Sequence, residues 1–177
     1  MTKLKIVILA SGSGTLAQAI IDAKLDLKIL ALISDKDSES LARARRAEIP
    51  AIYLPMLENR NEWDRQMVQE VGKYNPDLVV SVGFMRVLSR DFVEKFKIIN
   101  SHPSMLPKFP GAHAVRDVLA AGETITGTTI HWVDQGVDTG LIIKQRQIEI
   151  KPTDDEFTLH ERIKIVEREL IVETLQD

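Results

Sequence analysis

The sequence contains no cysteine. Disulfide bonds, zinc sites built from thiolates and cysteine nucleophiles are therefore excluded. It also lacks any apolar run long enough to span a membrane, and the apolar residues 5–10 are too few for the core of a signal peptide. We expect a cytoplasmic protein with no membrane partner.

An excess of positive charge is missing as well. The 26 acidic and 23 basic residues leave a formal net charge of -3, which argues against a nucleic-acid partner but leaves room for a local basic cluster that binds an anionic substrate. The chain has 177 residues, of which 44% are hydrophobic and 28% charged. These values are ordinary for a soluble domain and predict a single domain over residues 1–177.

Apolar segments alternate with helical patterns through the first half of the chain. The predicted strands are 5–10, 27–34, 51–54, 78–83 and 97–101, and the helices between them are 15–24, 39–47, 61–74 and 90–96. Strands without alternating polarity are typical of a parallel sheet that is buried on both faces. Helices of this length between them predict right-handed crossovers with helices on both faces of the sheet.

The pattern changes from Thr126 onward. Two segments of alternating polarity, TGTTIHWVD and LIIKQRQIEI, are separated by a turn-rich stretch and predict antiparallel strands at the edge of the sheet. Thr153 and Glu156 predict a capping box for a last helix, whose apolar stripe is formed by Leu159, Ile163, Val166 and Leu170. The predicted fold class is α/β, a Rossmann-like open and mostly parallel sheet with an antiparallel edge.

A glycine turn follows the first strand. Residues 12–17 (GSGTLA) match G-x-G-x-x-A between a strand and a helix, which is the arrangement that presents backbone N–H groups to an anion. Asp35 ends the second strand, where dinucleotide-binding folds place a ribose-binding acid. This segment is therefore compatible with NAD binding, with another phosphate ligand, or with a tight connection that binds nothing.

The fifth strand runs into Asn100-Ser101-His102-Pro103-Ser104. Asn100 and His102 share one face of a strand and lie at its carboxyl end, where open α/β sheets bind ligands. An amide donor beside an imidazole suits acyl transfer to an amine, because both can donate hydrogen bonds to the oxyanion that forms. The alternative is a turn-closing Asn and a His that is packed beside prolines.

A third polar residue, Asp138, lies in the turn Gly136-Val137-Asp138-Thr139-Gly140. Flanking glycines favour a loop that can approach a ligand closely. If Asp138 reaches His102, its charge raises the pKa of the imidazole and it can relay protons through water. Otherwise Asp138 is an ordinary turn former. We interpret His131 and His113 as structural or supporting residues.

Three segments in this order resemble phosphoribosylglycinamide formyltransferases, the folate-dependent enzymes of purine synthesis: GFMRVLS, NSHPSMLPKFPGAHAVRDVL and GTTIHWVDQGVDTG. The resemblance covers nearly the whole chain. It implies a Rossmann-like fold and transfer of formyl from 10-formyltetrahydrofolate, used as a co-substrate without a metal, to glycinamide ribonucleotide. It also implies that Asn100, His102 and Asp138 are the catalytic groups.

The same resemblance implies the binding residues. They are Gly12, Ser13, Gly14, Thr15 and Arg65 for the substrate phosphate, Glu167 on the side of the substrate amine, and Met85, Arg86, Val87 and Leu88 for the folate. Two positions depart from the pattern, because Leu16 replaces the usual Asn after the glycine turn and Ser101 replaces an aliphatic residue.

Two other functions remain open at this point. One is a related formyl-folate enzyme that acts on another amine or on water, and the other is a nucleotide-binding Rossmann module without catalysis. The expected partners are small-molecule substrates only, and the expected assembly is a monomer or homodimer.

Overall fold

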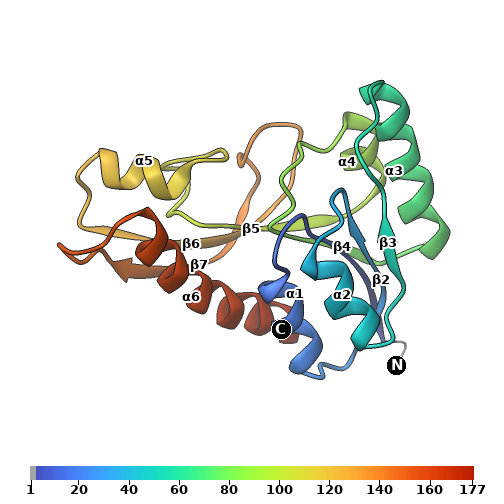
Figure 1. Ribbon diagram of the computed structural model, residues 1–177, viewed down its shortest axis with the longest axis horizontal. Helices are drawn as coiled ribbons and strands as arrows, with labels where there is room; N and C mark the ends of the chain where they lie inside the picture. The colour runs from blue at the N-terminus through green and yellow to red at the C-terminus, as the bar shows by residue number, and fades with distance from the viewer. Residues whose placement is uncertain (1–2) are drawn as a thin grey trace. The chain divides into compact units, whose positions relative to one another are not determined.

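The computed structural model describes residues 3–177. The described residues belong to two compact units, one up to Ile99 and the other from Asn100 to Asp177. We call them the N-terminal unit and the C-terminal unit and describe each by itself (Figure 1). The prediction of a single domain is not tested by this division and stays a prediction.

The N-terminal unit alternates strands and helices. In chain order it contains β1 (Leu4–Leu9), α1 (Thr15–Asp22), β2 (Leu27–Ser34), α2 (Glu39–Arg46), β3 (Ala51–Tyr53), α3 (Arg60–Tyr74), β4 (Leu78–Val82) and α4 (Arg90–Lys95). Strand β1 pairs in parallel with both β2 and β4, and β2 pairs in parallel with β3. Figure 1 shows α1 and α2 side by side, and α3 beside α4. Burial of residues 6–9 of β1 on both faces explains why this strand is uniformly apolar.

Strand β5 (Ile98–His102) begins in the N-terminal unit and ends in the C-terminal unit. The Val79 N–H donates to the Lys97 carbonyl at 2.8 Å, just before β5 begins. The complete strand order is β3-β2-β1-β4-β5-β6-β7. The order reverses between β1 and β4, as in doubly wound nucleotide-binding folds, so the segments that follow these two strands lie at the switch point.

The C-terminal unit contains α5 (Ala114–Ala120), β6 (Ile125–Trp132), β7 (Ile142–Glu149) and α6 (Glu156–Gln176). Strands β6 and β7 are antiparallel. Helices α5 and α6 pack together through a cluster that includes Val115, Val118, Leu159 and Ile163, with Ile148 of β7. This core holds α6 against β7, the strand that pairs with β6, and the turn that carries Asp138 follows β6.

The predicted fold class, with its parallel strands and antiparallel edge, is confirmed. The predicted strands and helices agree with the structure to within a residue or two, and β2 agrees at both ends. The predicted capping box is wrong, because Asp155 and Thr158 cap α6 in place of Thr153 and Glu156. In the apolar stripe, Leu159, Ile163 and Leu170 are buried and Val166 is partly buried against the same core, as predicted. The acid Glu167 is buried beside them, which was not predicted.

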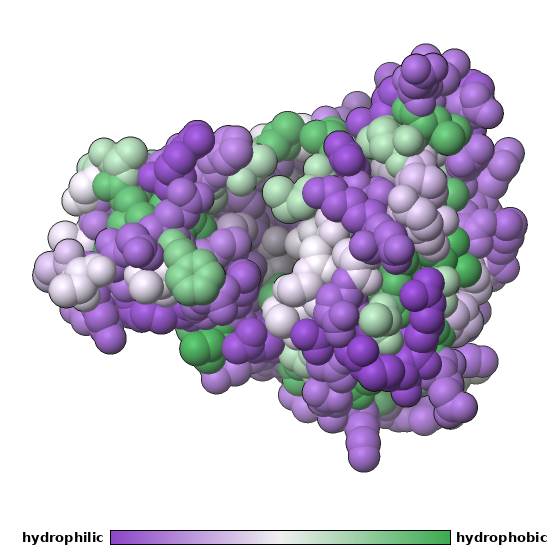
Figure 2. Space-filling view, in the orientation of Figure 1, coloured by the Kyte–Doolittle hydropathy of each residue, from purple (hydrophilic) through white to green (hydrophobic). Residues whose placement is uncertain are grey.

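On the face seen in Figure 2, hydrophilic side chains predominate and apolar ones form small separate areas. Scattered apolar side chains are normal on protein surfaces. Across residues 3–177, the structure has no helix with the length and apolar character needed to cross a membrane.

Candidate active site

Four polar side chains converge in the C-terminal unit. Strand β5 supplies Asn100 and His102, β6 supplies His131, and the turn after β6 supplies Asp138. The Asp138 carboxylate lies between the two imidazoles, with Oδ2 3.3 Å from Nδ1 of His102 and Oδ1 3.5 Å from Nε2 of His131. The three residues that the sequence nominated as catalytic therefore belong to one cluster, which also includes His131.

Both ring nitrogens of His102 have acceptors nearby. Nε2 lies 2.8 Å from the Phe109 carbonyl oxygen, and the opposite nitrogen faces Asp138. The Ser104 hydroxyl also donates to the Phe109 carbonyl, at 3.1 Å, which holds this loop against the ring. Because a carbonyl oxygen can only accept, the imidazole carries a hydrogen on Nε2.

His131 orients Asn100. Nδ1 of His131 lies 2.9 Å from the Trp132 carbonyl, so this nitrogen is the donor in the neutral ring and Nε2 is the acceptor. The Asn100 amide nitrogen lies 3.2 Å from Nε2 and donates to it. The sequence interpretation of His131 as a supporting residue agrees with this geometry. In the sequence, His131 lies on the strand just before the turn with Asp138, and this position could have indicated that it belongs to the cluster.

The electrostatics of the cluster differ in part from the expectation. Burial lowers the pKa of His102, and neither the Phe109 carbonyl nor the Asp138 charge reverses this effect. Asp138 thus raises the His102 pKa as expected, but desolvation outweighs it and the net direction is downward. Burial alone would raise the pKa of Asp138, but the hydrogen bond from the Gly111 N–H and the two nearby imidazoles lower it overall.

The backbone of the turn places Asp138. Its φ of 55° is left-handed, and its carboxylate accepts the Gly111 N–H at 2.8 Å. At the end of the turn, a Cβ on Gly140 would lie 1.7 Å from the Trp132 carbonyl oxygen. Glycine is therefore required there because the two backbone segments touch.

We expect Gly140→Ala to reduce the free energy of unfolding by about 1–3 kcal/mol, the usual cost of overpacking, and to lower enzymatic activity because the turn that carries Asp138 must shift. Denaturant unfolding and an activity assay measure the two effects. Gly72→Ala in α3 is the control, since a Cβ there meets only the flexible end of Lys95, at 3.3 Å. Equal stability of wild type and Gly140→Ala would contradict the close approach.

Glu167 lies on α6 and is only 4% exposed. The Ser101 hydroxyl donates to its carboxylate at 2.7 Å. Burial raises the pKa of Glu167 to about 7, although the Ser101 hydrogen bond and the Lys164 charge oppose the rise. The unusual Ser101 thus has a structural reason, because it gives a buried carboxyl group a hydrogen-bond partner.

The glycine turn lies in the N-terminal unit, at the start of α1. Gly14 is the N-cap with a left-handed φ of 72°, and no side chain caps the helix. The basic side chain that contacts the turn is Arg43 of α2, whose Nε donates to the Ser13 carbonyl at 2.7 Å. Sequence analysis missed Arg43. Leu16, in place of the usual Asn, is 8% exposed and joins the core.

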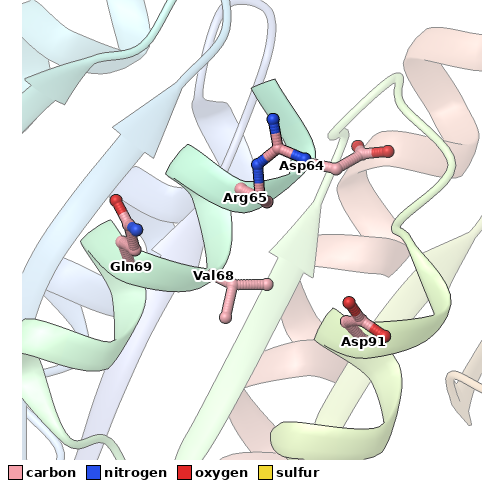
Figure 3. Close-up of a pocket in the computed structure, with 5 residues that line it drawn as sticks. All are labelled: Asp64, Arg65, Val68, Gln69 and Asp91. Atoms are coloured by element: carbon pink, nitrogen blue, oxygen red, sulfur yellow. The ribbon is translucent and has the colours of Figure 1, made fainter. Parts of the chain in front are cut away.

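Arg65, the other residue assigned to the phosphate, lies on α3. It is exposed and lines a surface pocket with Asp64, Val68 and Gln69 of the same helix and Asp91 of α4 (Figure 3). Its assignment stays a prediction, whereas the contact with the glycine turn is made by Arg43.

Asp35 does not have the setting of a free ribose-binding acid. Its side chain is fully buried and pairs with Arg86, whose Nε lies 2.7 Å away. The Ser11 hydroxyl donates to the other carboxylate oxygen at 2.5 Å. Binding a ribose hydroxyl would require this network to break, which argues against the dinucleotide interpretation.

The four residues assigned to the folate follow β4. Met85 and Val87 are 56% and 60% exposed, which is high for apolar side chains and fits a surface that covers a ligand. Two side chains of α3 hold this segment in place. Phe84 stacks on Trp63, and Arg60 donates to the Val87 carbonyl. In the described part of the chain, no group of His, Asp and Glu side chains has the arrangement of a metal site.

Comparisons with known proteins agree with the motifs. Residues 4–175 match the model of the formyl transferase family. The phosphoribosylglycinamide formyltransferase of Mycobacterium tuberculosis is 40% identical over 175 residues, which cover 95% of this chain and 81% of the relative. The Escherichia coli (strain K12) enzyme of the same name is 38% identical over 173 residues, covering 93% and 82%.

Solved structures give the same result. The crystal structure of glycinamide ribonucleotide transformylase 1 from Symbiobacterium toebii superimposes with a TM-score of 0.94 at 34% identity, over 98% of this chain and 86% of that one. The match of sequence and fold extends over nearly the whole chain, and this protein therefore belongs to the formyl transferase family.

Proposed function

We propose that this protein transfers the formyl group of 10-formyltetrahydrofolate to the amine of glycinamide ribonucleotide, in purine biosynthesis. The observation that carries the proposal is the cluster of Asn100, His102 and Asp138, in a chain similar to enzymes named for this reaction. The same similarity favours this acceptor over another amine or water, and favours an enzyme over a non-catalytic nucleotide-binding module.

The amine nitrogen of the substrate attacks the formyl carbon, and a tetrahedral intermediate with a negatively charged oxygen forms. Asn100 donates one amide hydrogen to His131 and has a second for this oxyanion. The His102 N–H that now goes to the Phe109 carbonyl is redirected to the oxyanion. The bond between the formyl carbon and the folate nitrogen then breaks.

The proton must pass from the attacking amine to the departing folate nitrogen. Asp138, whose pKa is lowered overall, is ionised at neutral pH and accepts this proton through a water molecule, then returns it to the folate nitrogen. The amine is left acylated and the folate protonated, so charge and atoms balance without a metal.

We assign the substrate phosphate to Gly12, Ser13, Gly14 and Thr15, with Arg65, and the folate to Met85, Arg86, Val87 and Leu88. Arg43 beside the turn adds positive charge that suits the phosphate. Glu167 is assigned to the amine side of the substrate, where it must exchange its Ser101 hydrogen bond for the ligand. We also propose one domain over residues 1–177 that acts in the cytoplasm as a monomer or homodimer, without nucleic-acid or membrane partners.

The test is a formyl-transfer assay in which glycinamide ribonucleotide, other amines and water are compared as acceptors. We expect product with glycinamide ribonucleotide and a much lower rate with the others. Correctly folded protein that forms no product with any amine would contradict the proposal. Tight NAD binding by calorimetry would support the dinucleotide interpretation instead.

A further inference from the structure

Two loops of the N-terminal unit meet at the point where the strand order reverses. Strands β1 and β4 are parallel neighbours, so the residues that follow them lie at the same edge of the sheet. The Ser11 N–H donates to the Gly83 carbonyl at 3.1 Å, and the Met85 N–H donates to the Ser11 hydroxyl at 2.9 Å. The start of the glycine turn and the start of the segment 84–87 are thus joined directly.

Asp35 completes this junction from the end of β2. One carboxylate oxygen accepts the Ser11 hydroxyl hydrogen and the other accepts from Arg86 Nε. Because the Ser11 hydrogen is directed to Asp35, the lone pairs of its oxygen face the Met85 N–H. Asp35 therefore fixes two successive residues, Met85 through Ser11 and Arg86 directly.

Burial makes this arrangement strongly dependent on the carboxylate. The Asp35 side chain is 0% exposed, whereas that of Arg86 is 35% exposed. A buried carboxylate is tolerated only when it is paired and hydrogen-bonded, so the two partners have one favourable geometry. Without Asp35, the partly exposed Arg86 side chain would turn to water and the Ser11 hydroxyl would lose its orientation.

We propose that Asp35 is a positioning residue for the formyl donor, because it holds Met85 and Arg86 in the conformation that binds 10-formyltetrahydrofolate. The inference rests on the proposed function, which assigns the segment 85–88 to the folate. Asp35 itself is covered by Ser11 and Arg86 and acts through them. Its loss should therefore weaken donor binding and leave the chemical step at His102 unchanged.

The experiment compares Asp35→Ala, Ser11→Ala and the double variant. We expect each single change to raise KM for 10-formyltetrahydrofolate about tenfold, equivalent to one hydrogen bond to a charged group of about 1.4 kcal/mol, with kcat within about twofold of wild type. The KM of the double variant should rise little above that of Asp35→Ala, because the contact of Ser11 with Met85 already depends on Asp35. Asp37→Ala, exposed on the same loop, is the matched control.

Calorimetric titration with 10-formyltetrahydrofolate alone separates donor binding from turnover. We expect the dissociation constant to rise with KM, and Asp35→Asn, which keeps an acceptor for Ser11, to show a smaller rise. A donor affinity within about twofold of wild type in folded Asp35→Ala or Asp35→Asn would overturn the positioning role. A wild type that binds the donor but forms no product with glycinamide ribonucleotide would contradict only the proposed acceptor, whereas one that does not bind the donor would overturn the positioning role too.

Discussion

His102→Ala is expected to lower kcat for formyl transfer by at least about 10²-fold, the scale of losing one oxyanion donor. The imidazole is held on both sides, by the Phe109 carbonyl and by Asp138. Alanine removes the N–H donor and leaves the Asp138 carboxylate without one of its two histidines. Steady-state kinetics with 10-formyltetrahydrofolate and glycinamide ribonucleotide measure the loss.

His113→Ala is the matched control for this change. His113 is exposed at the N-cap of α5, and its side chain makes no capping hydrogen bond. We expect the control to keep wild-type turnover. If His102→Ala retained near-normal kcat while its fold was intact, His102 would have no part in the mechanism, and Asn100 would be the remaining oxyanion donor of the cluster.

Glu167→Gln is expected to change how stability depends on pH. Burial raises the pKa of Glu167 to about 7 in the folded protein, from an ordinary value of 4.5. Between these two values the folded state keeps the proton and the unfolded state has lost it, so the stability of the wild type falls as the pH rises. Glutamine has no proton to lose. As the pH rises from 4.5 to 8, the free energy of unfolding of the variant should therefore increase on the order of 3 kcal/mol relative to that of wild type.

Urea unfolding at pH 5 and pH 8, followed by tryptophan fluorescence, tests this expectation. Glu169→Gln is the control, because this exposed residue lies on the same helix and pairs only at the surface with Arg146. We expect the stability of the control to change between pH 5 and pH 8 by the same amount as that of wild type. A parallel pH dependence for Glu167→Gln as well would show that the buried carboxyl group does not retain its proton.

Local sequence determined most of the fold. The continuous apolar strands, the helices between them and the alternation after Thr126 each reflect a period that neighbouring residues create, so the fold class was predictable. That Asn100 and His102 lie on one face of a strand was predictable for the same reason, because residues two apart on a strand point to the same side. The capping residues of α6 could not be predicted in this way. Asp155 and Thr158 have the same spacing as Thr153 and Glu156, and only the backbone geometry at the start of the helix distinguishes the two pairs.

Tertiary structure decided which distant residues meet. Asp138 reaches His102 because a left-handed turn and the Gly111 N–H direct its carboxylate, and the loop carbonyl of Phe109 takes the other ring nitrogen. The net fall in the His102 pKa was likewise beyond the sequence, because desolvation depends on everything that covers the ring.

The residues that we propose for ligand binding show the same division. The glycine turn could be recognised as a motif in the sequence, but the structure shows that Arg43 rather than Arg65 contacts it. Asp35 accepts hydrogen bonds from Ser11 and Arg86. The sequence by itself determined the fold class and which polar residues stand at strand ends, because these depend on neighbours in the chain. Only the tertiary structure decided their partners and their charge states, because both depend on contacts between segments far apart in sequence and on the water those contacts exclude.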